Sequence, residues 1–64
     1  MNENPFGPEL VLEDFWGNEL TITTLPGGEA ILYHTGGDNK NLPSRLFLNF
    51  DRAYNWAFNH GYRE

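Results

Sequence analysis

The first half of the chain alternates apolar and polar residues with a period of two. In residues 9–13, 20–24 and 29–34, Leu, Ile or Ala occupies alternate positions. These residues are Leu10 and Leu12, Leu20 and Ile22, and Ala30 and Leu32. A period of two is typical of a strand that buries one face against a core. We therefore predict three strands, with Leu10 and Leu12 among the buried residues of the first.

Turn-forming residues separate these strands. Residues 15–18 and residues 26–28 are rich in Gly, Asn and Pro, so each is predicted to close a hairpin. Residues 36–44 form a longer connection that is again rich in Gly and Asn. The apolar run Arg45 to Leu48 that follows is interpreted either as a fourth, short strand or as an extended lead into the next element.

A period of 3.6 residues replaces the period of two from Asn49 to Tyr62 and predicts one amphipathic helix. Asn49 can cap its first turn, and Gly61 can adopt the left-handed conformation that ends it. Tyr62 would then fold back on Ala57. The apolar face of this helix carries Phe50, Ala53, Tyr54, Ala57 and Phe58.

These elements predict an α+β fold: a three- or four-stranded antiparallel sheet with one C-terminal helix packed on one face. We expect a loose N-terminal arm over residues 1–8, where Pro5, Gly7 and Pro8 suit neither helix nor strand, and a single domain over residues 9–64. The predicted core consists of Leu10, Leu12, Leu20, Ile22, Ala30, Leu32, Leu46, Leu48, Phe50, Ala53, Ala57 and Phe58.

The 64 residues contain no Cys and only two His, so neither a disulfide framework nor a thiolate metal site is expected. A metal site formed by His34 with His60 or Asp38 is a weak alternative. No apolar run approaches the length of a membrane-spanning helix, and the first residues lack the pattern of a signal peptide, so we expect a cytoplasmic protein. No nucleophile motif is present, and the adjacent carboxylates of Glu13 and Asp14 should point to opposite faces; we expect no enzyme and no cofactor.

Charge is distributed unevenly along the chain. Residues 1–38 carry seven acidic residues and no Lys or Arg, giving −7, whereas residues 39–64 carry a net +2. Direct binding to nucleic acid depends on Lys and Arg that displace counterions from phosphates, so this layout disfavours it. A basic surface on a nucleic-acid-binding protein is the partner that we expect instead. The candidate binding residues are Glu13, Asp14, Trp16, Glu19, Glu29 and Asp38.

The ten aromatic residues are more than so small a core can bury. Trp16 either closes one end of the core or is an exposed anchor for a partner, and Trp56 is expected to be partly exposed. An alternative function is therefore a homo-oligomer or an accessory subunit, with Tyr33, Phe47 and Trp56 in the interface. A second alternative is weak nucleic-acid binding through Lys40, Arg45, Arg52 and Arg63.

Two resemblances bear on these alternatives. The segment FDRAYNWAFNHGY at residues 50–62 loosely resembles the helix of integrase arm-binding domains, a DNA-binding family. That family carries Lys and Arg on its sheet where this chain has Glu13, Glu19 and Glu29, so its function is not carried over. In size and charge the chain resembles small acidic inhibitors of phages and mobile elements, such as anti-restriction and anti-CRISPR proteins. This resemblance implies a DNA mimic that occupies a basic site, either as a monomer or as a small homo-oligomer.

Overall fold

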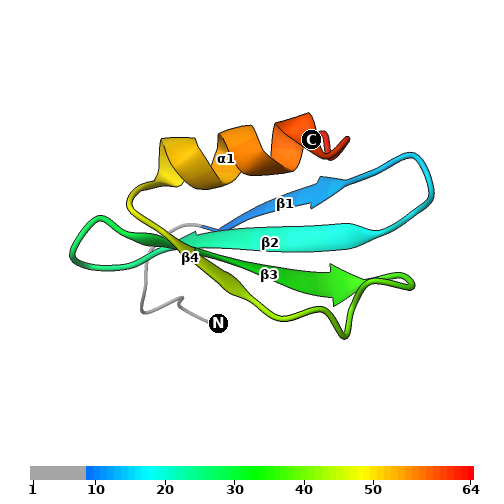
Figure 1. Cartoon of the computed structure of the whole chain (residues 1–64), viewed down its shortest axis with the longest axis horizontal. Coiled ribbons are helices and arrows are strands. Elements are labelled where there is room, and N and C mark those ends of the chain that lie inside the picture. Colours follow the sequence, from blue (N-terminus) through cyan, green and yellow to red (C-terminus); the bar gives the residue numbers. More distant parts are fainter. Residues whose placement is uncertain (1–8) are drawn as a thin grey trace.

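The structure is a computed structural model that describes residues 9–64 and shows the predicted α+β architecture (Figure 1). The arm expected at residues 1–8 lies outside the described residues. Within residues 9–64, no helix is long and apolar enough to cross a membrane. The elements follow in the order β1 Glu9–Glu13, β2 Glu19–Thr24, β3 Ala30–Gly36, β4 Arg45–Phe47 and α1 Phe50–Asn59.

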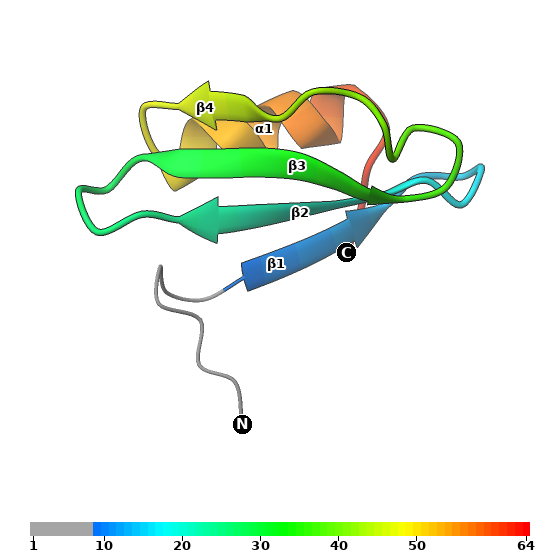
Figure 2. The same cartoon turned by 90° about the horizontal axis from the view of Figure 1, so that it is seen from below.

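The four strands form one antiparallel sheet in the order β1-β2-β3-β4, so each strand pairs with its neighbour in sequence. Leu12 lies opposite Leu20, and Ile22 lies opposite Leu32, so the buried residues of adjacent strands share one face. The segment after residue 44, which the sequence allowed to be either a strand or an extended lead into the helix, is a strand that pairs with β3. Strands β1 and β4 form the two edges of the sheet, and α1 lies across one face (Figures 1 and 2).

The core fills the space between the helix and this face of the sheet. Ala53 and Ala57 are fully buried at the contact, and their small side chains let the helix backbone approach the strands closely. Half-buried Leu10, Phe47 and Phe50 pack around the centre. The fully or nearly fully buried residues are Leu12, Leu20, Ile22, Ala30, Leu32, Ala53, Ala57 and Tyr62.

Three residues of the predicted core are exposed. Leu46 is 67% exposed and Leu48 is 71% exposed, because β4 places Phe47 opposite Ala30 and so turns Phe47 toward the helix. With a period of two, Leu46 must then face the uncovered side of the sheet. Phe58 is 45% exposed because the closest contact of the helix follows Ala53 and Ala57, which leaves Phe58 on the flank of the helix.

Both ends of α1 are capped by the residues that the sequence predicts. The Asn49 side chain accepts a hydrogen bond of 3.0 Å from the backbone N–H of Arg52 at the start of the helix. At the end, Gly61 adopts a φ of +93°, and the Tyr62 N–H donates to the Ala57 carbonyl over 3.0 Å. This reversal buries the Tyr62 ring, a core residue that the sequence analysis omitted from its list.

The reversal at Gly61 also returns the chain to the sheet. Arg63 pairs with Glu13 through two backbone hydrogen bonds of 2.8 and 2.9 Å along the outer edge of β1. The Tyr62 hydroxyl accepts a hydrogen bond of 3.3 Å from the Asn39 side chain in the loop between β3 and β4. The C-terminal residues therefore connect the helix, the edge strand and this loop at one end of the molecule.

The contact between helix and sheet can be tested with Ala53→Asp. A carboxylate at this fully buried position would have no partner, and a core of this size supplies only about 3–5 kcal/mol of stability. We expect the cooperative thermal unfolding transition, followed by circular dichroism, to disappear. The matched control is Asn55→Asp, which adds the same charge on the exposed face of α1 and should unfold like the parent. An unchanged melting temperature for Ala53→Asp would contradict the packing described above.

The end of the helix can be tested with Gly61→Ala. A Cβ at Gly61 meets no atom within 4 Å, so the substitution measures the cost of the left-handed backbone alone. We expect a loss of about 1–2 kcal/mol, which lowers the melting temperature of a domain of this size by several degrees. Gly61→Asn should lose less, because Asn tolerates this conformation better than Ala. Equal losses in the two variants would argue against a backbone effect.

Candidate functional site

The turn between β1 and β2, residues 14–18, is held by the side chain of Asp14. Its carboxylate accepts backbone N–H groups of Trp16 and Asn18 over 2.9 and 2.8 Å, and it accepts the Asn18 side-chain amide over 2.9 Å. Desolvation acts to raise the pKa of Asp14, but these hydrogen bonds to the charged form outweigh it and hold the pKa below its ordinary value of 3.8. The residue predicted to bind a partner therefore also fixes the shape of this turn.

Two large aromatic side chains project from the turn that Asp14 holds. Phe15 is 89% exposed and Trp16 is 80% exposed, and their rings contact each other edge to face with centres 5.4 Å apart. Trp16 is thus exposed and does not close an end of the core. Phe15 was not among the predicted binding residues, although its position beside Trp16 in a turn was a usable signal.

Two glutamates lie directly at the base of this turn. Glu13 and Glu19 are partners across the β1-β2 ladder, so both side chains are on the face of the sheet that the helix leaves open. Like charges directly opposite each other do not stabilise a sheet, and this pair concentrates negative charge beside the turn. We define the hairpin epitope as Glu13, Asp14, Phe15, Trp16 and Glu19.

Hydroxyl groups hold the glutamates of the open face in place. Thr35 donates a hydrogen bond of 2.8 Å to Glu19 and shares another with Thr21. A register shift beside Glu19, opposite β3, brings Thr35 into this position. Farther along the sheet, the Tyr33 hydroxyl donates to Glu9 over 3.0 Å. Hydrogen bonds to hydroxyl groups therefore order the carboxylates of the open face, and Glu19 is oriented before any partner arrives.

The remaining acidic candidates lie at opposite ends of the sheet. Asp38 lies in the loop after β3, next to Asn39, whose backbone N–H donates to the Asn18 side chain over 3.2 Å. This loop packs tightly on the turn, since a Cβ at Gly37 would lie 2.7 Å from the Asn18 Cα. Glu29 belongs to the turn between β2 and β3, at the other end of the strands (Figure 1). The structure thus brings together Glu13, Asp14, Trp16, Glu19 and Asp38 and separates Glu29 from them.

The aromatic residues of the predicted secondary interface lie on different faces. Tyr33 is half-buried on the open face, where its hydroxyl bonds to Glu9. Trp56 is half-buried on the helix side and packs against Phe47, with ring centres 6.3 Å apart. The guanidinium of Arg45 lies 4.8 Å from the centre of the Trp56 ring. These residues do not form one continuous apolar surface.

The two histidines lie near each other, beside Arg45, around a small cavity. Burial, and then the positive charge of Arg45, lower the pKa of His34. The His60 ring donates from Nδ1 to the Trp56 carbonyl over 2.7 Å and stacks on the Trp56 ring. Within residues 9–64, no three His, Cys, Asp or Glu side chains are grouped closely enough to hold a metal ion.

A comparison of the chain with protein-family models, with curated proteins and with solved structures finds no match. The fold and the site define a small two-layer α+β domain that displays an acidic and aromatic hairpin.

The role of Asp14 predicts a pH dependence of stability. Because its pKa is lower in the folded than in the unfolded chain, its stabilising effect is complete above the ordinary value of 3.8 and is lost as the pH falls through the folded value. We expect Asp14→Asn to melt below the parent at about pH 6 and the difference to shrink toward about pH 2. Thermal unfolding across this range measures the difference. A constant difference would contradict the assigned role.

Proposed function

We propose that this protein is a non-enzymatic inhibitor that places its hairpin epitope in a basic site of a nucleic-acid-handling protein, where its carboxylates take the place of phosphates. The single observation that carries the proposal is the pairing of Glu13 with Glu19 at the base of the turn that carries the exposed rings of Phe15 and Trp16. This arrangement offers a partner both charge and apolar area.

The rigidity of the epitope supports a role in binding. Asp14 fixes the turn and Thr35 orients Glu19, so little conformational freedom remains to be lost when a partner binds. Trp16 offers a large, rigid apolar surface at the tip, and the carboxylates below it would guide a basic surface toward it. Asp38 extends the negative charge at the same end of the sheet. Glu29 belongs to the other end and is not part of this proposal.

The basic residues favour a protein partner over nucleic acid. The Arg63 guanidinium donates to the carbonyl oxygens of Phe58 and Tyr62, and the Arg45 guanidinium covers the ring of Trp56. Two of the four cations are thus engaged within the chain. The proposal places the protein in the cytoplasm, where nucleic-acid enzymes work and where a chain without Cys loses nothing from a reducing environment.

The experiment is affinity capture with the full chain immobilised. Proteins are captured from the heparin-binding fraction of a lysate of the cells in which the protein acts. We expect a nucleic-acid-binding protein to be retained, to be eluted by duplex DNA, and to bind more weakly when salt rises from about 50 to about 200 mM. Trp16→Ala should weaken binding at least about tenfold. Its melting temperature should stay unchanged, because Trp16 is 80% exposed.

The charge requirement is tested by Glu13→Gln combined with Glu19→Gln, with Glu29→Gln as the matched control at the other end of the sheet. The double variant should lose most of the binding, and the control should keep it. Retention that duplex DNA cannot displace, or equal retention by the double variant and the control, would contradict the proposal. Self-association of the chain that persists in high salt would instead support the oligomer alternative.

A further inference from the structure

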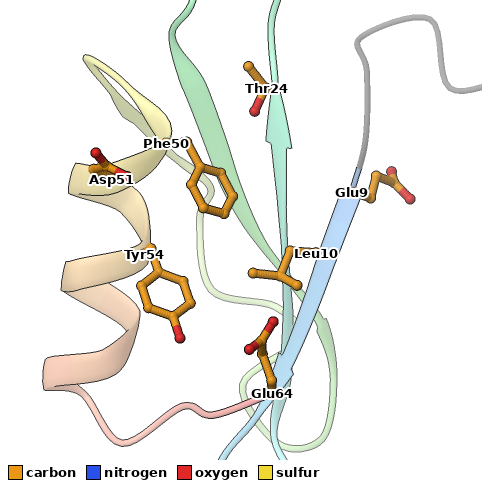
Figure 3. A pocket seen from close by; sticks show the side chains of 7 residues that line it. All are labelled: Glu9, Leu10, Thr24, Phe50, Asp51, Tyr54 and Glu64. Atoms are coloured by element: carbon orange, nitrogen blue, oxygen red, sulfur yellow. The ribbon is translucent and has the colours of Figure 1, made fainter.

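A groove runs between the edge strand β1 and the helix α1 (Figure 3). It encloses about 620 Å³. The rings of Phe50 and Tyr54 extend from the helix toward Leu10 on β1, and the Glu64 carboxylate lies beside the Tyr54 ring and Leu10 (Figure 3). The floor of the groove is therefore apolar and aromatic. It lies nearer the start of β1, whereas the hairpin epitope lies at its end.

All the charged residues that line this groove are acidic. Asp51 and Glu64 line it, and no Lys or Arg is among its lining residues. Glu9 also borders the groove, but its carboxylate points away from it (Figure 3) and accepts the Tyr33 hydroxyl on the open face. An apolar floor flanked by two carboxylates is complementary to a cationic side chain that also has apolar or planar surface.

The chain itself shows how such a side chain binds this helix. Phe50, Tyr54 and Phe58 follow one another at intervals of four residues, and their rings stack with centres 6.0 and 6.4 Å apart. The Arg63 guanidinium carbon lies 3.8 Å from the centre of the last ring, Phe58. The planar guanidinium of Arg63 thus covers Phe58 at one end of the aromatic row, while the rings of Phe50 and Tyr54 line the groove.

The backbone of the edge strand is available in the same region. Glu13 uses its outward N–H and C=O to pair with Arg63. Because these groups alternate in direction along an antiparallel strand, those of Val11 point to the same outer side. Among residues 9–64, Arg63 is the one residue that pairs with this edge, so the edge beside Val11 is open to another strand.

We propose that this groove binds an extended, arginine-bearing segment of a partner protein, which adds a short strand to β1 at Val11. Its backbone continues the pairing that Arg63 begins, and every second side chain turns into the groove. An arginine at such a position stacks on Tyr54 or Phe50 and pairs with Asp51 or Glu64. This site and its test are independent of the proposed function, because no residue of the hairpin epitope lines the groove.

The probe is a blocked seven-residue peptide of alternating threonine and arginine, titrated into the full chain at low salt and followed by two-dimensional NMR. We expect the amide signals of Leu10, Val11 and Tyr54 to shift, and the Val11 amide to exchange more slowly with solvent. The same peptide with citrulline, a neutral analogue of arginine, should bind at least about fivefold more weakly.

Variants of the protein separate the charge from the backbone contribution. Asp51→Asn combined with Glu64→Gln should weaken binding of the arginine peptide to about the level of the citrulline peptide. Glu29→Gln, which removes a charge from a residue outside both the groove and the hairpin epitope, is the matched control and should bind like the parent. Val11→Pro removes the outward N–H of an edge strand, where proline is tolerated, and should abolish most of the binding and the peptide-induced shifts of Leu10 and Tyr54.

Three outcomes would overturn the proposal. The first is equal binding of the arginine and citrulline peptides. The second is a set of shifts centred on Glu13 and Glu19 instead of Val11, which would place the peptide on the hairpin epitope. The third is no binding together with NMR contacts between residues 1–8 and Tyr54, which would show that the chain's own N-terminal segment occupies the groove. Thermal unfolding of each variant verifies that a loss of binding is not a loss of fold.

Discussion

The contact between α1 and one face of the sheet is the constraint on which the rest of the structure depends. Ala53 and Ala57 bring the helix close to the strands, and Leu20, Ile22 and Leu32 fill the space beneath them. A single ten-residue helix cannot cover both faces of a four-stranded sheet. Residues 9–64 therefore leave the opposite face and the flank beside β1 uncovered, and these are the two places where the hairpin glutamates and the groove lie.

The end of the helix is linked to the hairpin between β1 and β2. Gly61 reverses the chain, and Tyr62 then accepts a hydrogen bond from Asn39, whose backbone in turn bonds to Asn18 in the turn held by Asp14. A continuous series of hydrogen bonds thus joins the helix, the long loop and the β1-β2 turn. These hydrogen bonds restrict the motion of the polar groups that support the turn carrying Trp16.

The fold determines where the charge on which the proposed function depends is displayed. The acidic first half of the chain does not become one patch, because the hairpins send its residues to both ends of the strands. Glu13, Asp14, Glu19 and Asp38 gather at one end, Glu29 lies at the other, and Glu9 bonds to Tyr33 in between. Position in the sequence does not show which of these acidic residues lie together, since strand direction decides which end of the sheet each turn occupies.

The sequence by itself determined the element order, the strand faces of β1 to β3 and both caps of the helix, because periodicity and special residues such as Asn49 and Gly61 act locally. Only the tertiary structure decided the rest. Three apolar residues in succession, Leu46 to Leu48, carry no alternation, so pairing with β3 chose Phe47 for the core. The exposure of Trp16 and the groove beside β1 likewise follow from where distant segments meet.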